Sequence, residues 1–333
     1  MKSLRSHAKG GPETLTLDEI PGPSPGPGEV LIAVKACGIN FPDTLIVEDL
    51  YQFKPERPFA PGGEVSGVVE AVGAGVSRCK AGDRVTALLI HGGLSENVIA
   101  AQASVFALPD SVGFETGAAL TLAYGTSLYA LKLRAQLKPG ETLLVLGAAG
   151  GTGISAVELG KAMGARVVAA VSSEEKAAAV RSAGADEVVI YSRPPFDKEQ
   201  SRALGAALKA ACGPDGAQVI YDAVGGDYAE PAIRAIGWEG RYLVIGFTAG
   251  IPKLPLNLTL LKSCDVRGVF YGAFTAREPE TNAALVAELF AMVASGQIKP
   301  PISQTFPLSR GGEAIAVLGE RRAIGKIVVT MGD

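Results

Sequence analysis

The sequence predicts an α/β protein in which a doubly wound parallel-sheet domain is inserted into a β-rich domain. Between residues 142 and 272, Val-, Ile- and Leu-rich runs alternate with helical segments, as in a parallel sheet covered on both faces. Short strands with glycine-rich turns fill the first third of the chain, and short β segments return after residue 296. The 333 residues also exceed the roughly 150 typical of one domain. We therefore expect residues 120–272 to form the inserted domain, and residues 1–119 plus 273–333 to form the β-rich domain.

The β-rich domain is predicted from short apolar runs that glycine and proline interrupt. Its expected strands lie at 30–36, within 63–76, within 81–89, at 96–101, at 104–109 and at 325–330. Their spacing is typical of a barrel or sandwich. A long helix over 279–296 precedes the C-terminal strands.

The inserted domain is predicted to open with a helix over 115–133, because apolar residues recur there at helical spacing. Strands and helices then alternate. The expected strands lie at 142–147, 166–172, 187–191, 218–224, 240–247 and 266–272, and the first two crossover helices at 154–164 and 174–184. Gly164 and Gly184 end these two helices, as glycine commonly does.

Composition excludes several classes of protein. Hydrophobic residues make up 47% and charged residues 20%, which is a globular composition. The net charge of −3 argues against a nucleic-acid-binding protein. No apolar run approaches the roughly 18 residues needed to span a membrane. The four cysteines are scattered, without disulfide or zinc spacing, so a cytoplasmic location is expected.

A glycine-rich turn between the strand at 142–147 and the following helix is the most informative motif. The segment AAGGTG (148–153) places Ala148, Gly150 and Gly153 in the slots of a G-x-G-x-x-G pattern, with Gly151 and Thr152 between the last two. Glycine lets the backbone approach a pyrophosphate, and the N–H groups at a helix N-terminus stabilise its charge. The strand–turn–helix–strand context predicts a dinucleotide site.

The tip of the next strand bears on which dinucleotide is bound. NAD sites usually carry a carboxylate there, but this strand ends in Val171, Ser172 and Ser173, with Lys176 one helical turn later. Two hydroxyls and a cation suit a 2′-phosphate, so we predict NADPH. Glu174 and Glu175 are also consistent with an ordinary helix start capped by serine, and both interpretations can hold together.

These motifs, in this order, resemble the zinc-independent quinone oxidoreductase branch of the medium-chain dehydrogenase/reductase superfamily. The resemblance covers nearly the whole chain. It includes the opening segment 10–43, PFAPGGEVSGVVEAVGAGV (58–76), AGDRV (81–85), the turn at 148–153 and GKIVVT (325–330). It implies a Rossmann domain inserted into a GroES-like catalytic domain, a soluble enzyme and a homodimer paired through the strand near 266–272.

The resemblance also indicates that no metal is bound. Zinc-dependent members carry a cysteine where this chain has Asn40, and a histidine where it has Gly63. Neither residue is a zinc ligand, and the four-cysteine lobe of those enzymes is missing. The two histidines are His7 and His91, and His91 is expected in a surface loop.

A pocket without zinc is better suited to activated acceptors than to simple alcohols. The resemblance therefore implies NADPH-dependent hydride transfer to a quinone or an α,β-unsaturated carbonyl compound. It implies Asn40 as a polar orienting group, with Asp43 and Tyr51 as further catalytic candidates. For Asp43 a turn-stabilising role is an equal alternative, and for Tyr51 the alternative is an amphipathic loop residue.

Further cofactor-binding residues follow from the resemblance alone. They are Thr121, Tyr124, Tyr191, Gly246, Phe247, Phe270, Tyr271, Gly272 and Arg321. Tyr191 and Arg321 are assigned to the adenosine phosphate, and Thr121 and Tyr124 to the nicotinamide. The others are expected at the ligand crevice, at the carboxyl ends of the fifth and sixth strands. Phe247 and Phe270 are equally consistent with plain core residues.

Two other functions remain open from the sequence. One is a reductase of enoyl thioesters or 2-haloacrylate-type acids on the same fold. The other is a non-catalytic NADPH-binding protein with a structural or regulatory role. Substrate-dependent NADPH oxidation separates an enzyme from a binding protein.

Overall fold

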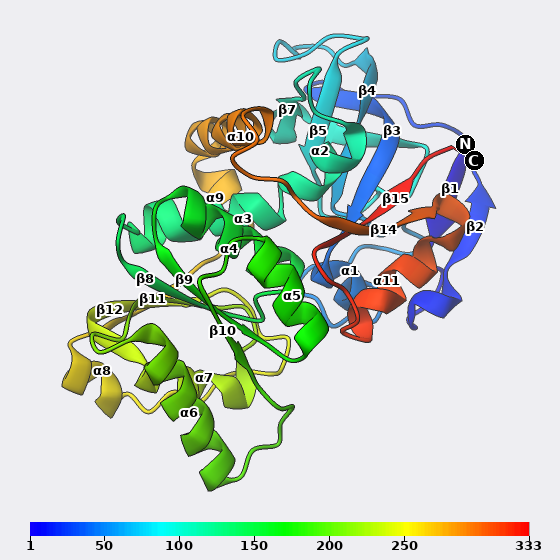
Figure 1. The fold of residues 1–333 in the computed structure, drawn as a ribbon. Coiled ribbons are helices and arrows are strands. Elements are labelled where there is room, and N and C mark those ends of the chain that lie inside the picture. The colour runs from blue at the N-terminus through cyan, green and yellow to red at the C-terminus, as the bar shows by residue number, and fades with distance from the viewer. Residues whose placement is uncertain (333) are drawn as a thin grey trace. The chain divides into compact units, whose positions relative to one another are not determined.

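The computed structural model describes residues 1–332 and consists of two compact units. Unit 1 contains residues 1–122, 278–296 and those from 300 onward, and unit 2 contains residues 123–277 and 297–299. The predicted fold class is confirmed, because the middle of the chain forms a doubly wound parallel sheet while both ends form a β-rich unit (Figure 1).

Unit 1 is built on a seven-stranded sheet with strand order β14-β15-β3-β4-β5-β7, and β6 pairs with β3. A separate two-stranded sheet joins β1 and β2. The strands are β1 (Lys2–Arg5), β2 (Thr16–Glu19), β3 (Glu29–Ile39), β4 (Glu64–Val72), β5 (Arg84–Leu88), β6 (Asn97–Ala101), β7 (Val105–Ala107), β14 (Ile302–Pro307) and β15 (Lys326–Thr330). The helices are α1 (Phe41–Ile46), α2 (Phe114–Leu120), α10 (Pro279–Ala294) and α11 (Gly311–Gly319).

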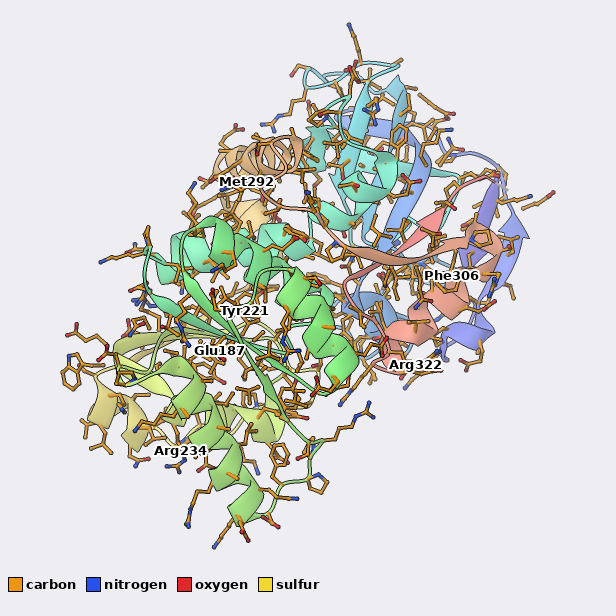
Figure 2. The ribbon with its side chains drawn as sticks, in the orientation of Figure 1. Glu187, Tyr221, Arg234, Met292, Phe306 and Arg322 are labelled. Carbon is orange, nitrogen blue, oxygen red and sulfur yellow. The ribbon has the colours of Figure 1, made fainter. Side chains whose placement is uncertain are left out.

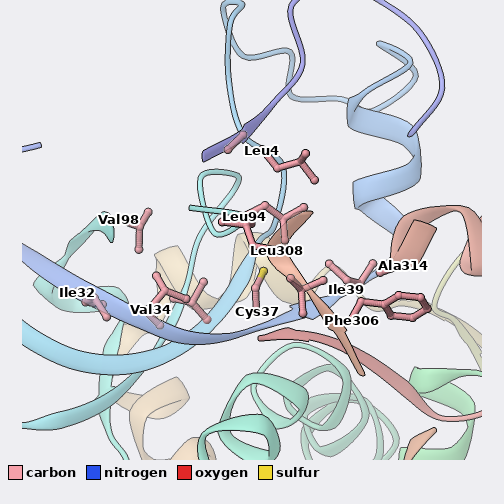
Figure 3. Close-up of a cluster of buried hydrophobic side chains, with 14 of the residues drawn as sticks. Leu4, Ile32, Val34, Cys37, Ile39, Leu94, Val98, Phe306, Leu308 and Ala314 are labelled. Carbon is pink, nitrogen blue, oxygen red and sulfur yellow. The ribbon is translucent and has the colours of Figure 1, made fainter. Parts of the chain in front are cut away.

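The hydrophobic core of unit 1 lies against β3, the longest strand of the sheet. Alternate residues of β3, including Ile32 and Val34, are buried there, as expected for a strand with one face on a core. Figure 3 shows these side chains with Leu94 and with Phe306 from the C-terminal part of the chain. Distant segments thus share one core, which explains why the sequence pattern resumes after the inserted unit.

Unit 2 is a six-stranded parallel sheet with strand order β10-β9-β8-β11-β12-β13. The strands are β8 (Thr142–Leu146), β9 (Arg166–Val171), β10 (Glu187–Ile190), β11 (Ala217–Asp222), β12 (Ile236–Val244) and β13 (Asp265–Gly268). The helices are α3 (Ala123–Leu128), a π-helix (Tyr129–Ala135), α4 (Gly151–Ala162), α5 (Glu174–Ser182), α6 (Lys198–Cys212), α7 (Ala229–Arg234), α8 (Asn257–Lys262) and α9 (Tyr271–Arg277). The strand order reverses between β8 and β11, which is where open α/β sheets bind ligands.

The central strands of unit 2 are buried because helices cover them. Every residue of β8 is buried, and α6 and α7 pack on the face that carries Leu144, Leu146 and Val168. Figure 2 shows Tyr221 of β11 in the interior of this unit, whereas Arg234 at the end of α7 is at its surface. The near-continuous apolar runs of the sequence therefore correspond to a sheet that is covered by helices.

The prediction of a single helix over 115–133 is wrong, because this segment is divided into α2, α3 and a π-helix. The division between α2 and α3 falls at Thr121 and Leu122. There the N–H of Leu122 donates to the side chain of Glu64 at 2.8 Å. Apolar spacing cannot reveal a break that a distant carboxylate causes.

The strand predicted over 266–272 is too long. β13 ends at Gly268, and Tyr271 and Gly272 belong to α9. A helical turn here buries Tyr271 and Phe274, and the ring of Phe274 stacks on Tyr129 with centroids 4.1 Å apart. The strand predicted over 240–247 is also displaced, since β12 ends at Val244 and Gly246 follows it in a loop.

β13 is an edge strand of the six-stranded sheet, and the homodimer expected through it stays a prediction. Within residues 1–332, none of the helices combines the length and apolar character required to cross a membrane.

Candidate functional site

The glycine-rich turn folds back on the carbonyl of Gly147, directly after β8. Gly147 has a φ of +65°, and the N–H of Gly150 donates to its carbonyl at 3.0 Å. Ala148 is fully buried, and its N–H bonds the carbonyl of Ala170 in β9 at 3.1 Å. The positive φ thus falls one residue before the first slot of the motif, which explains why alanine is accommodated there.

Gly153 must be glycine because of this turn. A Cβ at this position would lie 2.2 Å from the Gly147 carbonyl oxygen and 2.8 Å from the Cα of Ala148. Its absence lets the turn and α4 pack closely, as the third glycine of such motifs does. The N-terminus of α4, at Gly151, therefore lies at the carboxyl end of β8, where it can hold a pyrophosphate.

A cluster of buried hydroxyl groups supports the first turn of α4. The Ser127 hydroxyl donates to the Thr152 carbonyl at 3.0 Å and lies 2.8 Å from the hydroxyls of Ser155 and Tyr221. Thr152 is one of the predicted cofactor-binding residues, but the hydroxyl cluster of Ser127, Ser155 and Tyr221 was not predicted. These three residues occupy positions in α3, α4 and β11 where an apolar side chain would equally fit the pattern. Periodicity alone therefore does not show that their hydroxyl groups meet.

The tip of β9 brings together the three residues predicted for the 2′-phosphate. The Ser173 hydroxyl caps α5 by accepting from the N–H of Lys176 at 3.3 Å, and the Lys176 ammonium donates to the Ser172 hydroxyl at 3.4 Å. The helix-cap interpretation and the clustering of cation and hydroxyls thus coexist. Such a group suits a dianionic phosphate and offers no carboxylate for a ribose hydroxyl.

Tyr191 directly follows β10, at the same edge of the sheet. Its ring packs against Tyr228, with centroids 4.7 Å apart, and Phe196 contacts Tyr228 edge-on at 5.2 Å. Because this aromatic group lies two strands from β8, it is placed where the adenosine half of a dinucleotide would lie. Its cofactor contact remains a prediction.

The other residues predicted for the cofactor are dispersed. The hydroxyl of Tyr124 donates to Glu158 within unit 2, and Tyr124 is fully buried. Tyr271 is 4% exposed and packs over Gly125, whereas Phe247 and Phe270 are about half exposed.

Four further residues predicted for the cofactor lie in segments outside the glycine-rich turn. One of them, Thr121, directly follows α2 in unit 1, and its hydroxyl donates to Glu64 at 2.9 Å. Gly246 lies in the loop after β12, Gly272 lies in α9, and Arg321 lies after α11 in unit 1 with a φ of +58°. Their contacts with a cofactor stay predictions.

In unit 1, Asn40 and Asp43 form the start of α1. The carboxylate of Asp43 accepts from the N–H of Asn40 at 2.8 Å and from the N–H of Gly62 at 2.9 Å. Asp43 is 2% exposed, and burial raises its pKa to about 6 although both hydrogen bonds act in the opposite direction. The geometry gives Asp43 the turn-stabilising role that the sequence left as an alternative, and leaves its catalytic role a prediction.

Tyr51 lies in the loop after α1, beside the small apolar cluster of Ile46, Val47 and Phe59. Its ring contacts Phe53, with centroids 5.9 Å apart. Burial, with a smaller contribution from the charge of Asp43, raises the pKa of the Tyr51 hydroxyl. Tyr51 therefore keeps its proton at neutral pH and can act as a hydrogen-bond donor.

Sequence reasoning missed a buried ion pair between Glu64 and Lys326, with a distance of 3.0 Å. Strand register explains it: Ile39 is opposite Ile327, so Asn40 and Lys326 are neighbours, and Gly38 is opposite Glu64. Gly38 also lacks room for a side chain, because a Cβ would lie 1.8 Å from the carbonyl oxygen of Ala118. The one sequence signal for this pair is that β4 begins with an acidic residue, Glu64, and β15 begins with a basic residue, Lys326, while the residues that follow them are mostly apolar.

The residues at the two zinc-ligand slots do not fit a zinc ion. Gly63 has no side chain, and the oxygen of Asn40 accepts a hydrogen bond from the Lys326 ammonium at 2.5 Å. A cation already at this position opposes the binding of a second one, and neutral amides are poor zinc ligands. Among residues 1–332, no three or more His, Cys, Asp or Glu side chains are grouped to hold a metal.

Comparison with known protein families gives two matches in chain order. The alcohol dehydrogenase GroES-like domain family matches residues 26–124, and the zinc-binding dehydrogenase family matches residues 151–289. The first match lies almost entirely in unit 1, and the second lies mostly in unit 2.

Individual relatives cover nearly the full chain. A quinone oxidoreductase of Pseudomonas aeruginosa is 36% identical, over 98% of this chain and 99% of its own. A quinone oxidoreductase-like protein 2 homolog of Nematostella vectensis is 36% identical over 91% of this chain and 82% of its own. The structure of Escherichia coli quinone oxidoreductase complexed with NADPH is similar, with a TM-score of 0.90 and 31% identity over 99% of this chain and 100% of the other.

Proposed function

Because the chain belongs to the quinone oxidoreductase branch of the medium-chain dehydrogenase/reductase superfamily, we propose that it reduces quinones or α,β-unsaturated carbonyl compounds without zinc. It is an NADPH-dependent oxidoreductase, in keeping with relatives whose structures are complexed with NADPH. The observation that supports the zinc-free part is the Lys326 ammonium beside Asn40, at the position of a zinc ligand in other members.

The residues of unit 2 fit NADPH. The turn at 150–153 and the N-terminus of α4 would hold the pyrophosphate, and Ser172, Ser173 and Lys176 would hold the 2′-phosphate. Bound NADPH supplies a hydride, so that a quinone or enone which also takes up one proton becomes a quinol or a saturated carbonyl compound.

On the acceptor side, Tyr51 is the more available donor. Both amide hydrogens of Asn40 are used, by the Gly38 carbonyl at 3.1 Å and by Glu64 at 3.0 Å. The hydroxyl of Tyr51, which is half-buried, can donate to the oxygen on which charge develops as hydride arrives. Asn40 then acts by orienting neighbouring groups, and water supplies the proton.

The proposed class of acceptor follows from which catalytic groups each reaction needs. Oxidising a simple alcohol requires a base or a Lewis acid at the hydroxyl. A conjugated acceptor requires only a donor at its oxygen, because its carbon is already electron-poor. A neutral tyrosine beside an apolar loop meets that smaller requirement.

An acceptor panel tests the proposal, with loss of NADPH absorbance as the measurement. Quinones and enones should be reduced, enoyl thioesters should react more slowly, and simple alcohols should not reduce NADP⁺. A preference for enoyl thioesters would show that these, rather than quinones and enones, are the substrate class. NADPH binding without turnover of any acceptor would favour a non-catalytic binding protein. Elemental analysis should find no stoichiometric zinc.

A variant pair sharpens this test. Tyr51→Phe should lower turnover by ~10²–10³, the usual effect of removing an oxyanion-type donor. Tyr129→Phe removes a hydroxyl from a ring in unit 2 that stacks on Phe274, and it should leave turnover at the wild-type level. Equal turnover of Tyr51→Phe and wild type would exclude Tyr51 as the donor.

A further inference from the structure

The ion pair of Glu64 and Lys326 is fully enclosed in unit 1. Their side chains are 0% and 1% exposed. A buried ion pair is a poor device for stability alone, since the desolvation of both charges offsets their attraction, and apolar residues of similar size often serve as well. The charges therefore call for a role beyond packing.

Glu64 uses its two oxygens for different segments of the chain. Oε1 accepts from the Thr121 hydroxyl at 2.9 Å and from the Leu122 N–H at 2.8 Å. Oε2 accepts from the Asn40 amide at 3.0 Å and from the Lys326 ammonium at 3.0 Å. One carboxylate thus holds the end of α2 and the residue before α1.

Lys326 completes the arrangement from the other side. Its ammonium donates to Oδ1 of Asn40 at 2.5 Å as well as to Glu64. The amide of Asn40 is therefore held with its oxygen toward a cation and its nitrogen toward a carboxylate. A flipped amide would place donor against donor and acceptor against acceptor, so only one orientation is compatible with the pair.

We propose that Glu64 and Lys326 are positioning residues of the reductase, which hold Asn40 in one orientation and tie it to the end of α2 at Thr121. This role rests on the proposed function, in which Asn40 orients the acceptor side of the site. A neutral pair cannot replace it, because a glutamine at position 64 has one acceptor oxygen for the four hydrogens that Glu64 receives. The two charges thus specify an orientation rather than add stability.

The test is the charge-neutral double variant Glu64→Gln/Lys326→Met in the full-length protein. Removing both charges leaves no unpaired buried ion, so the variant should still fold, with a thermal stability lowered by the buried donors that a glutamine at position 64 cannot accept. Turnover with the best quinone or enone should fall by about 10²-fold, the scale of a small misplacement of a site. NADPH affinity should be largely retained, because the glycine-rich turn and the cluster of Ser172, Ser173 and Lys176 lie in unit 2.

A spectroscopic signal reports on Asn40 directly. In protein labelled with ¹⁵N-asparagine, the side-chain amide of Asn40 is identified by its loss in Asn40→Ala. We expect slow exchange with solvent in wild type, and a shifted, faster-exchanging signal in the double variant. An unchanged signal together with unchanged turnover would overturn the proposal.

Matched variants keep every outcome decisive. Arg310→Met/Glu313→Gln neutralises an exposed pair at the start of α11 in the same unit, and it should change neither turnover nor the Asn40 signal. If the buried double variant does not fold, Glu64→Asp is the second variant, because it keeps the negative charge on a shorter side chain. The same shift of the Asn40 signal and the same loss of turnover are expected. If wild type reduces no acceptor, the proposed function fails, while the Asn40 signal still decides whether the pair orients the amide.

Discussion

In unit 2, the candidate cofactor site consists of backbone and small side chains that are close in sequence. The turn at 147–153 and the tip of β9 at 172–176 are each a short local segment. In unit 1, the candidate acceptor site depends on charged and polar side chains at positions 40, 64, 121 and 326. A local site is sensitive to single backbone positions, whereas a dispersed one is sensitive to the loss of any partner in its network.

The largest expected effect is that of Asn40→Ala in unit 1. This change removes one hydrogen-bond partner from the Lys326 ammonium and one from Oε2 of Glu64, although these two groups still bond each other, and weakening a buried polar network is costly. Because Asn40 orients the groups around it, turnover should fall by about 10²-fold or more, the scale of a small misplacement of a site, with NADPH affinity nearly unchanged. Steady-state kinetics and fluorescence titration of NADPH measure the two quantities. Unchanged turnover would remove Asn40 from the site.

Gly153→Val is the corresponding change in unit 2, and its effect should fall on cofactor binding. Any Cβ at 153 meets backbone atoms of the turn, so the turn must shift. Overpacking of about 3 kcal/mol corresponds to about 100-fold weaker NADPH binding. Gly268→Ala is the control in the same unit, because a Cβ there meets nothing within 4 Å. Equal affinities of the two variants would contradict the proposed role of the turn.

Lys176→Ala tests which dinucleotide the local site prefers. The loss of a charge-assisted contact with the 2′-phosphate should weaken NADPH binding by roughly 1–3 kcal/mol. NADH lacks that phosphate, so its affinity should hardly change. Lys209→Ala removes an exposed cation of α6 as a control. A parallel loss of NADH affinity would assign Lys176 to the fold rather than to the phosphate.

The smallest effect concerns Asp43, whose pKa is raised from 3.8 to about 6 in the folded state. The folded protein binds this proton more tightly than the unfolded chain does, so the contribution of Asp43 to stability decreases as the pH rises through 6. Between about pH 5 and pH 7.5, this contribution should decrease by about 1 kcal/mol. Denaturant unfolding of wild type and Asp43→Asn at both pH values isolates this contribution. If the free energy of unfolding changed equally with pH in the two proteins, the raised pKa of Asp43 would be contradicted.

The strands and helices of unit 2 were predicted from local sequence patterns. The strand at 142–147 is β8 (Thr142–Leu146), and the strand at 166–172 is β9 (Arg166–Val171). The helix after the turn begins at Gly151 rather than at 154, because glycines with low helix propensity are held in the first turn by contacts that only the fold provides. Boundaries that depend on tertiary contacts, such as the end of β13 at Gly268, were missed for the same reason.

The sequence by itself determined the fold class, the glycine-rich turn and the cluster of Ser172, Ser173 and Lys176, because each depends on periodicity or on residues a few positions apart. It also supplied Asn40 and Glu64 without indicating that they meet. Only the tertiary structure decided that Lys326, 262 residues from Glu64, would be its partner. The physical reason is that strand register, set by burial of the apolar faces of β3, β4 and β15, brings these charges together, and no local pattern encodes that register.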